Sequence, residues 1–195
     1  MNVQAGNIIK KYKELSDKYF YIKDIAIFVF LTFVIHYVYR FWMIQYDFRI
    51  LGIQVITPGL EAWFARVVFL MNYWIMNLFS SFTVQDNVFV FANGYSLEVT
   101  FGCSGIKQIL QFVVLMMIFP GPWKHKLWYI PMGAVIVFLV NVLRILLLCV
   151  VMNYLPRYFN FTHDYPLRVI FYVVIFILWG IWNEKFNRKG FKTQS

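Results

Sequence analysis

Three side chains that lie far apart in the sequence can together attack a carbonyl group: Cys103, Arg144 and His163. A cysteine thiolate is a good nucleophile, and histidine is the usual side chain that takes up and returns the proton. The permanent charge of an arginine stabilises an oxyanion or holds a substrate carboxylate. These three types predict acyl transfer to or from a peptide. Simpler interpretations stay open at this point: Cys103 as a loop residue that enters a membrane helix, and Arg144 reaching the lipid headgroups.

Cys103 lies in the stretch Thr-Phe-Gly-Cys-Ser-Gly-Ile-Lys, residues 100–107, where a β-rich segment ends and a long apolar segment begins. If the apolar segment is a helix, Cys103 lies at its first turn. There the unpaired N–H groups and the positive end of the helix dipole favour a thiolate. The other cysteine, Cys149, lies in an apolar run and is predicted to be inert packing. Two cysteines predict no disulfide framework.

The composition predicts a membrane protein. Of 195 residues, 61% are hydrophobic and only 14% are charged, which is typical of a polytopic membrane protein rather than a soluble domain. The net charge of +9 comes mostly from the two ends and one short connection. This distribution indicates orientation in a membrane rather than nucleic-acid binding. The three histidines are scattered without ligand spacing, so we expect no metal and no cofactor.

The expected fold is an all-α polytopic membrane protein of four transmembrane helices, possibly five. Basic tails at residues 1–24 and 184–195 flank a single membrane-embedded catalytic domain, residues 25–183. The apolar runs place the four spans at about residues 25–46, 104–119, 128–155 and 166–182.

Two further elements are expected between the first two spans. Residues 60–80 divide into a polar and an apolar half on a helical wheel, which favours an amphipathic helix along the membrane interface. A fifth span with a buried polar face is the alternative. Residues 87–101 read as a short extracytoplasmic β-hairpin, because Asn93-Gly94 separates two β-rich runs. The hairpin runs directly toward Cys103 and would hold it rigidly.

Polar residues inside the predicted spans should face the protein interior. Ser104, Lys107, Gln108 and Gln111 recur at helical spacing and form one stripe. In the first span, His36 and Arg40 share a face, and we assign them no role. The candidates for substrate binding or support are Ser104, Lys107, Gln108, Asn141 and Asp164.

The charge distribution also predicts sidedness. Both tails and the turn around Lys124 and Lys126 are basic, so all three should be cytoplasmic, which requires an even number of spans and favours four. Arg144 is then roughly 16 residues, or about 24 Å, from the cytoplasmic end of its helix, near the outer edge of a ~30 Å core. Cys103 and His163 are expected at the same outer boundary.

These residues resemble the exosortase/archaeosortase family. The resemblance is carried by Cys103-Ser104-Gly105-Ile106 before a membrane helix, by Asn141-x-x-Arg144 late in another, and by His163 in the next outer loop. It implies a membrane cysteine transpeptidase with Cys103 as nucleophile, His163 as general acid or base and Arg144 as electrostatic stabiliser. Larger members have about eight spans, so this chain is similar to compact members.

The resemblance also implies the partners and the location. The substrates would be exported proteins with a C-terminal sorting signal, made of a short motif, an apolar span and a basic tail. The enzyme would lie in the bacterial cytoplasmic membrane with both termini inside and the active site outside. Membrane lipid is an expected partner, and nucleic acid is not.

Two other functions remain open from the sequence. Gly102-Cys103-Ser104-Gly105 matches Gly-x-Ser-Gly and resembles the nucleophile motif of rhomboid proteases, which would make Ser104 the nucleophile of a serine intramembrane protease. A Ser104–Lys107 pair has the same implication. A non-enzymatic scaffold or carrier subunit would instead use the polar stripe to bind a partner helix.

Overall fold

The computed structural model describes residues 22–39, 41 and 53–187 of the chain. It divides the chain into two compact units, Met1–Gln45 and Tyr46–Ser195, and each unit is described by itself. The side chains of residues 53–58, Asp164, Arg168 and Asn187 lie outside the description. Residues 1–21 of the expected N-terminal tail, Arg40 and the end of the C-terminal tail also lie outside the described residues.

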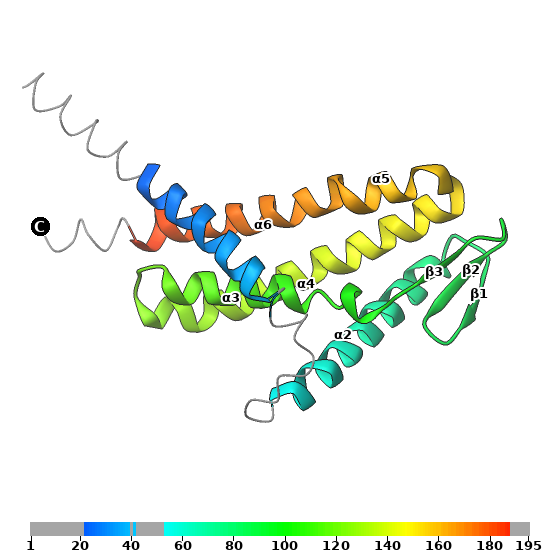
Figure 1. Ribbon diagram of the computed structural model, residues 1–195, viewed down its shortest axis with the longest axis horizontal. Coiled ribbons are helices and arrows are strands. Elements are labelled where there is room, and N and C mark those ends of the chain that lie inside the picture. Colours follow the sequence, from blue (N-terminus) through cyan, green and yellow to red (C-terminus); the bar gives the residue numbers. More distant parts are fainter. Residues whose placement is uncertain (1–21, 40, 42–52, 188–195) are drawn as a thin grey trace, which may run out of the picture. The chain divides into compact units, whose positions relative to one another are not determined.

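The first unit contains one described helix, which is blue in Figure 1 and runs over Ile22–Tyr39. It is long and apolar enough to cross a membrane. His36 lies near its end and meets the ring of Tyr37 edge-on, with the ring centroids 5.7 Å apart. This contact joins two neighbours on the same helix and indicates no chemistry.

The second unit begins with helix α2, Ile53–Met76, and a three-stranded antiparallel sheet. The strands are β1 (Phe82–Gln85), β2 (Val88–Phe91) and β3 (Ser96–Glu98), in the order β1-β2-β3. The sheet has one strand more than the expected hairpin. The additional strand is β1, and a second tight turn joins it to β2. In this turn Asp86 has a φ of 53°, a conformation that Asp and Gly accept more readily than other residues.

The rest of the second unit is helical. It consists of α3 (Ile106–Ile118), α4 (Trp123–Tyr154), the 3₁₀ turn η2 (Pro156–Tyr158), α5 (Phe159–Asp164), α6 (Pro166–Trp182) and the π-helical turn η3 (Asn183–Asn187). Figure 1 shows α4 running the length of this unit, with α3 and α6 packed against it. Helix α4 is therefore the element to which most of the others attach.

Helix α4 starts earlier than residue 128, where the sequence placed it, so Lys126 lies in its first turns and not in a loop. Lys126 is buried, and its Nζ donates hydrogen bonds to the carbonyls of Met117 and Phe119 at 3.0 and 2.7 Å. These carbonyls lie at the end of α3, where no further turn of helix supplies donors. Lys126 therefore links the start of α4 to the end of α3 through two hydrogen bonds.

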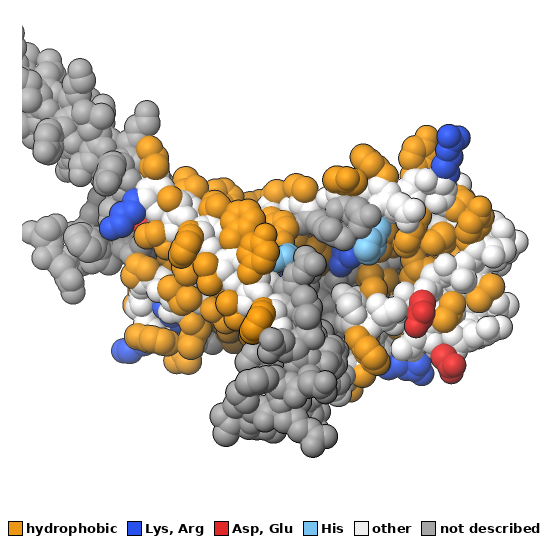
Figure 2. All heavy atoms as spheres, viewed as in Figure 1, with side chains coloured by type: hydrophobic (Ala, Val, Ile, Leu, Met, Phe, Trp, Pro, Cys, Tyr) orange, Lys and Arg blue, Asp and Glu red, His pale blue; other side chains and the backbone are white. Residues whose placement is uncertain are grey.

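The described residues include three helices long and apolar enough to span a membrane: Ile22–Tyr39, Trp123–Tyr154 and Val169–Phe186. On α4, exposed aliphatic side chains run from Leu127 to Leu147, a rise of about 30 Å that matches the hydrocarbon core of a bilayer, and the exposed aromatic residues Trp123 and Tyr154 lie beyond the two ends of this band. Hydrophobic side chains cover much of the face that Figure 2 draws. The chain is a multi-pass membrane protein.

Helix α3 differs from the full span that the sequence suggested at residues 104–119. It has 13 residues, and its rise of about 20 Å is shorter than the hydrocarbon core. The left-handed conformation of Gly105 delays the start of the helix to Ile106. The number of spans, four or five, stays a prediction.

The polar half of helix α2 is only partly exposed to solvent. Glu61 and Asn72 are buried against the protein, whereas Trp63 and Trp74 are exposed. The expected interfacial orientation, with the polar half in water, therefore does not describe these four side chains. The reason is tertiary packing, because the buried face of α2 covers α4 and the turn that carries Cys103.

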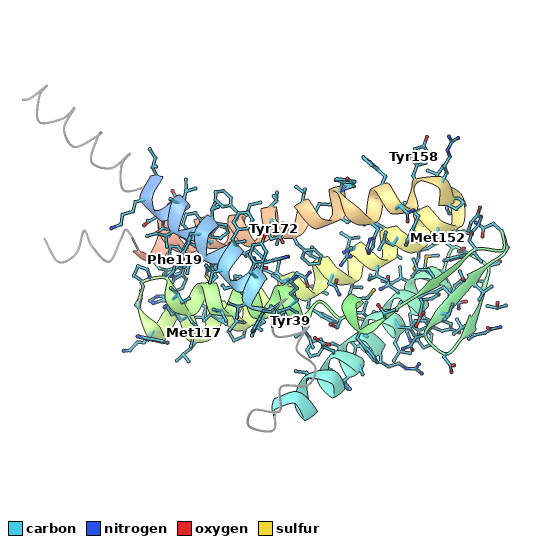
Figure 3. The ribbon with its side chains drawn as sticks, in the orientation of Figure 1. Tyr39, Met117, Phe119, Met152, Tyr158 and Tyr172 are labelled. Atoms are coloured by element: carbon cyan, nitrogen blue, oxygen red, sulfur yellow. The ribbon has the colours of Figure 1, made fainter. Side chains whose placement is uncertain are left out.

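A hydrophobic core joins α2, the sheet and the second half of α4. Its members are Val68, Phe69, Met76, Phe89, Phe91, Leu97, Val99, Val142, Ile145, Leu148, Cys149, Met152 and Leu167. Cys149 is completely buried there, as expected of inert packing. Met152, labelled in Figure 3, lies near the end of α4 close to the strands, and Asn93 donates a hydrogen bond to its carbonyl at 2.9 Å. The second half of α4 and the sheet thus form one rigid support.

Candidate active site

Cys103 ends a single 3₁₀ turn, Phe101–Cys103, that follows the sheet. Its N–H donates to the carbonyl of Thr100 at 2.9 Å, and the Oγ1 of Thr100 lies 3.8 Å from its Sγ. Helix α3 begins three residues later, at Ile106. The expectation that Cys103 lies in the first turn of that helix is therefore wrong, because Gly105 interrupts the right-handed backbone between them.

Gly105 has a φ of +77°, which places it in the left-handed region where a side chain is strained. A Cβ at this position would also lie 2.8 Å from Cγ and Nδ2 of Asn141. Both the backbone conformation and the close approach of α4 therefore require glycine. The Cys-Ser-Gly turn lies directly on the side chain of Asn141.

Asn141 is completely buried, and its Nδ2 donates a hydrogen bond to the carbonyl oxygen of Cys103 at 2.7 Å. Among the residues that the structure describes, no donor lies within hydrogen-bond reach of its Oδ1. Asn141 therefore acts on the turn through one donated bond. This bond crosses 38 residues of sequence and holds the backbone of Cys103 against α4.

Arg144 lies one turn further along α4 and contacts His163. Its Nη2 is 3.3 Å from Nε2 of the imidazole, and its guanidinium lies 5.8 Å from the ring centroid of Phe171. The ring of His163 stacks on Phe159, with centroids 5.8 Å apart and an angle of 18° between the planes. Both Arg144 and His163 are half-buried. The aromatic rings fix the two polar groups in one relative orientation.

A hydrogen bond at this contact is compatible with one tautomer of the imidazole. A guanidinium only donates hydrogen bonds, so Nε2 of His163 must accept. The imidazole of His163 is then neutral, with its proton on Nδ1. A neutral imidazole is the form that can take up a proton from a thiol.

His163 is carried by a helix rather than the loop that the sequence suggested. Residues 156–164 form η2 and α5, and His163 lies in the last turn of α5, just before α6 begins at Pro166. Phe159 and His163 are four residues apart and share one face of α5, which explains their stacking. The sequence signal for this short helix is weak, because none of its residues, Phe-Asn-Phe-Thr-His-Asp, is a strong helix former.

Helix α4 joins the three candidates. Asn141 holds the backbone of Cys103, and Arg144 contacts His163; these two helix positions differ by a rise of about 4.5 Å. Cys103 is half-buried and packs against the same core that surrounds the second half of α4. On the face drawn in Figure 2, histidine atoms lie beside lysine or arginine atoms, so polar groups reach the surface there.

The supporting candidates fall into three groups. Ser104 is 3% exposed, and its Oγ accepts a hydrogen bond from the N–H of Ile106 at 3.4 Å. Lys107 and Gln108 are half-buried on the first turn of α3, whereas Gln111, one turn on, is buried. Asp164 ends α5, and its side chain lies outside the described part of the chain.

Sequence reasoning missed Thr100, Phe159 and Phe171. Thr100 borders the thiol because a 3₁₀ turn brings residues three apart together. The two phenylalanines enclose the Arg144–His163 pair from different helices. No local signal identifies them, since aromatic residues make up 22% of the sequence.

Comparison with known proteins gives one family. The model of the transmembrane exosortases matches residues 25–180, a range that contains every candidate residue. Comparison with the curated proteins and with the solved structures finds no match. The match covers most of the sequence, and the chain belongs to the transmembrane exosortase family.

Proposed function

We propose that this protein is an integral-membrane cysteine peptidase that acts at the outer face of the cytoplasmic membrane. It cleaves exported proteins at their C-terminal sorting signal and transfers the exported protein, held on the enzyme as a thioester, to an amine acceptor. One observation carries the proposal. A single turn of α4 holds the backbone of Cys103 through Asn141 and contacts His163 through Arg144. A nucleophile, a proton acceptor and a fixed positive charge are thus attached to one rigid element.

In the proposed reaction, His163 takes the proton of the Cys103 thiol, and the thiolate attacks the carbonyl carbon of the scissile peptide bond. The resulting oxyanion needs a positive donor, and Arg144 supplies one. For Nε2 of His163 to accept the proton, its contact with Arg144 must lengthen. The same movement releases the guanidinium to donate to the oxyanion.

The second half of the reaction returns the proton. When the peptide bond breaks, the imidazolium of His163 protonates the leaving amine, and the substrate remains as a thioester on Cys103. An amine acceptor or water then attacks the thioester carbon, and His163 takes the proton of this nucleophile. The bond between the carbonyl carbon and Sγ of Cys103 breaks, and the imidazolium of His163 returns its proton to the departing thiolate, so each cycle begins from the same state.

The depth of the site supports action at the membrane edge. Arg144 lies 17 residues beyond Leu127, where the exposed aliphatic side chains of α4 begin, and this is a rise of about 26 Å. It therefore lies near the far end of the apolar band. Lys124 and Lys126 lie at the other end of α4, and Lys185 follows α6 there. Basic residues favour the cytoplasmic side, and this charge distribution supports our proposal that Arg144 lies near the outer side.

A serine protease that uses Ser104 is the alternative enzyme. The hydroxyl of Ser104 is buried and already accepts a hydrogen bond from Ile106. These contacts suit a residue that stabilises the start of α3 better than a nucleophile. The exposed fraction and the position of Cys103 favour the thiol instead.

The test is cleavage of an exported substrate by the purified protein in proteoliposomes. Cys103→Ala should abolish cleavage, and Ser104→Ala should retain it within a small factor. The reverse result contradicts the cysteine mechanism. Full cleavage by both variants would favour a non-enzymatic scaffold or carrier that co-purifies with a protease. A covalent thioester trapped on Cys103 would exclude this non-enzymatic function.

A further inference from the structure

We propose that the outer edge of strand β3 binds the substrate by adding the extended segment next to the scissile bond as a fourth strand. This inference rests on the proposed function, since it names how the substrate of that same site is held. Peptides that add to a sheet edge bind through main-chain hydrogen bonds, with alternate side chains giving selectivity. The sequence to be cut would therefore be read mainly through its backbone.

The register of the sheet shows which backbone groups face outward. Strand β3 is an edge, because the order is β1-β2-β3. Leu97 pairs with Phe89, and the N–H of Val99 donates to the carbonyl of Asn87 at 3.0 Å. Since donors alternate along an antiparallel strand, the N–H and carbonyl groups of Ser96 and Glu98 point away from β2.

This edge leads directly to the candidate nucleophile. Only Val99 and Thr100 separate Glu98 from the 3₁₀ turn that ends at Cys103. Ser96, Glu98 and Thr100 are exposed, whereas Leu97 and Val99 fill the core. An added strand would lie about 4.8 Å from β3, so its main chain would pass beside the start of the turn.

The occupant must be an extended peptide. A row of main-chain donors and acceptors at a sheet edge is complementary to another strand. The strand β1 also forms an edge, but β2 and β3 separate it from Cys103 by about 10 Å of sheet width. The edge of β1 therefore serves as an internal control, because it has the same backbone donors and acceptors but lies too far from Cys103 to hold the scissile bond beside the thiol.

Proline substitution tests the outward N–H of β3. Glu98→Pro removes a donor that β2 does not use, and proline is tolerated at such edge positions. Glu98→Ala removes the side chain and keeps the donor. Val84→Pro makes the same backbone change on β1, where the register Val84↔Phe89 turns the N–H of Val84 outward.

Binding of a fluorescent substrate peptide to each variant is measured in the Cys103→Ala background, and KM and kcat are measured with the thiol present. Glu98→Pro should weaken binding and raise KM by about tenfold, the effect of one lost hydrogen bond at a desolvated edge. Glu98→Ala and Val84→Pro should stay within about twofold of the parent protein. Equal binding by Glu98→Pro, or an equal loss in Glu98→Ala, overturns the proposal.

A second measurement uses the unaltered enzyme and decides the matter if Glu98→Pro does not fold. Substrate peptides N-methylated at one residue at a time should show a loss of affinity at every second position, because alternate N–H groups of an added strand face β3. A loss without this period contradicts strand addition. These outcomes are separate from the cysteine mechanism, which fails only if Cys103→Ala still cleaves.

Discussion

Asn141 donates a hydrogen bond to the carbonyl oxygen of Cys103 at 2.7 Å, although 38 residues separate the two in the sequence. Asn141 is completely buried, and the glycine beside the turn leaves room for its amide. The position of the thiol is therefore set by α4 rather than by the helix that follows it. This relationship is the basis of the first two predictions.

Asn141→Ala should lower kcat by about 10–100-fold with little change in KM, because the turn that carries Cys103 loses its tether. Asn153→Ala is the matched control: Asn153 is on the same helix and donates to Ser80 Oγ at 2.9 Å, away from the thiol. It should cost stability only. Rates of Cys103 alkylation in the folded protein give an independent readout, and an unchanged rate in Asn141→Ala would contradict the tether.

Gly105→Ala should unfold the turn or inactivate the enzyme, since the new methyl group would overlap Asn141 in a strained left-handed backbone. The double variant Gly105→Ala with Asn141→Gly removes the overlap. It should recover part of the thermal stability and none of the activity. Equal stability of the single and double variants would show that the close contact has no energetic effect.

Arg144→Lys should reduce kcat by about 100-fold, because an ammonium lacks the planar fork that reaches Nε2 of His163 and lies over Phe171. Arg66→Lys is the control, since Arg66 is exposed and donates to Asn87 on the outside of the sheet. We expect Arg66→Lys to behave like the parent protein. Full activity of Arg144→Lys would show that charge alone is sufficient.

Thiol labelling should distinguish the two cysteines and the two membrane faces. An impermeant maleimide added to intact cells should label Cys103, which is half-buried, and should not label Cys149, which is fully buried. Lys124→Cys in a background without the native cysteines should react only after permeabilisation, because Lys124 is exposed at the other end of α4. The opposite pattern would reverse the orientation.

Lys126→Met should destabilise the protein by about 1–3 kcal/mol, since the carbonyls of Met117 and Phe119 lose their buried donor. The neighbouring Lys124 is exposed, and Lys124→Met should change stability by less than about 0.5 kcal/mol. Thermal unfolding in one detergent measures both. A similar melting temperature for the two variants would mean that Lys126 does not stabilise the end of α3.

Local patterns in the sequence account for much of the fold. Apolar runs predict long helices such as α4 and α6, and the Asn93-Gly94 pair predicts a tight turn, which the φ of +82° at Gly94 fits. The three candidate residues were identified from their chemistry and from the depth that helix rise implies. These inferences need only neighbouring residues or a regular rise.

Contacts between distant residues could not be predicted in this way. The left-handed Gly105 moves the start of α3, and the close approach that accompanies it depends on Asn141 in another helix. The short helix α5 forms where Phe159 stacks on His163, and the sequence there is compatible with a loop. The buried polar residues of α2 likewise reflect packing against α4, which a helical wheel does not contain.

The length of α4 has a consequence for the choice of substrate. The helix has 32 residues, a rise of about 48 Å, and Arg144 lies about two thirds of the way along it. Under the proposed function, the substrate is still anchored by its own apolar span, and a bond within a few residues of the end of that span would lie at the depth of the thiol. Inserting a spacer between motif and span would move the cut bond past the site, so the rigid helix would select substrates by linker length as well as by motif.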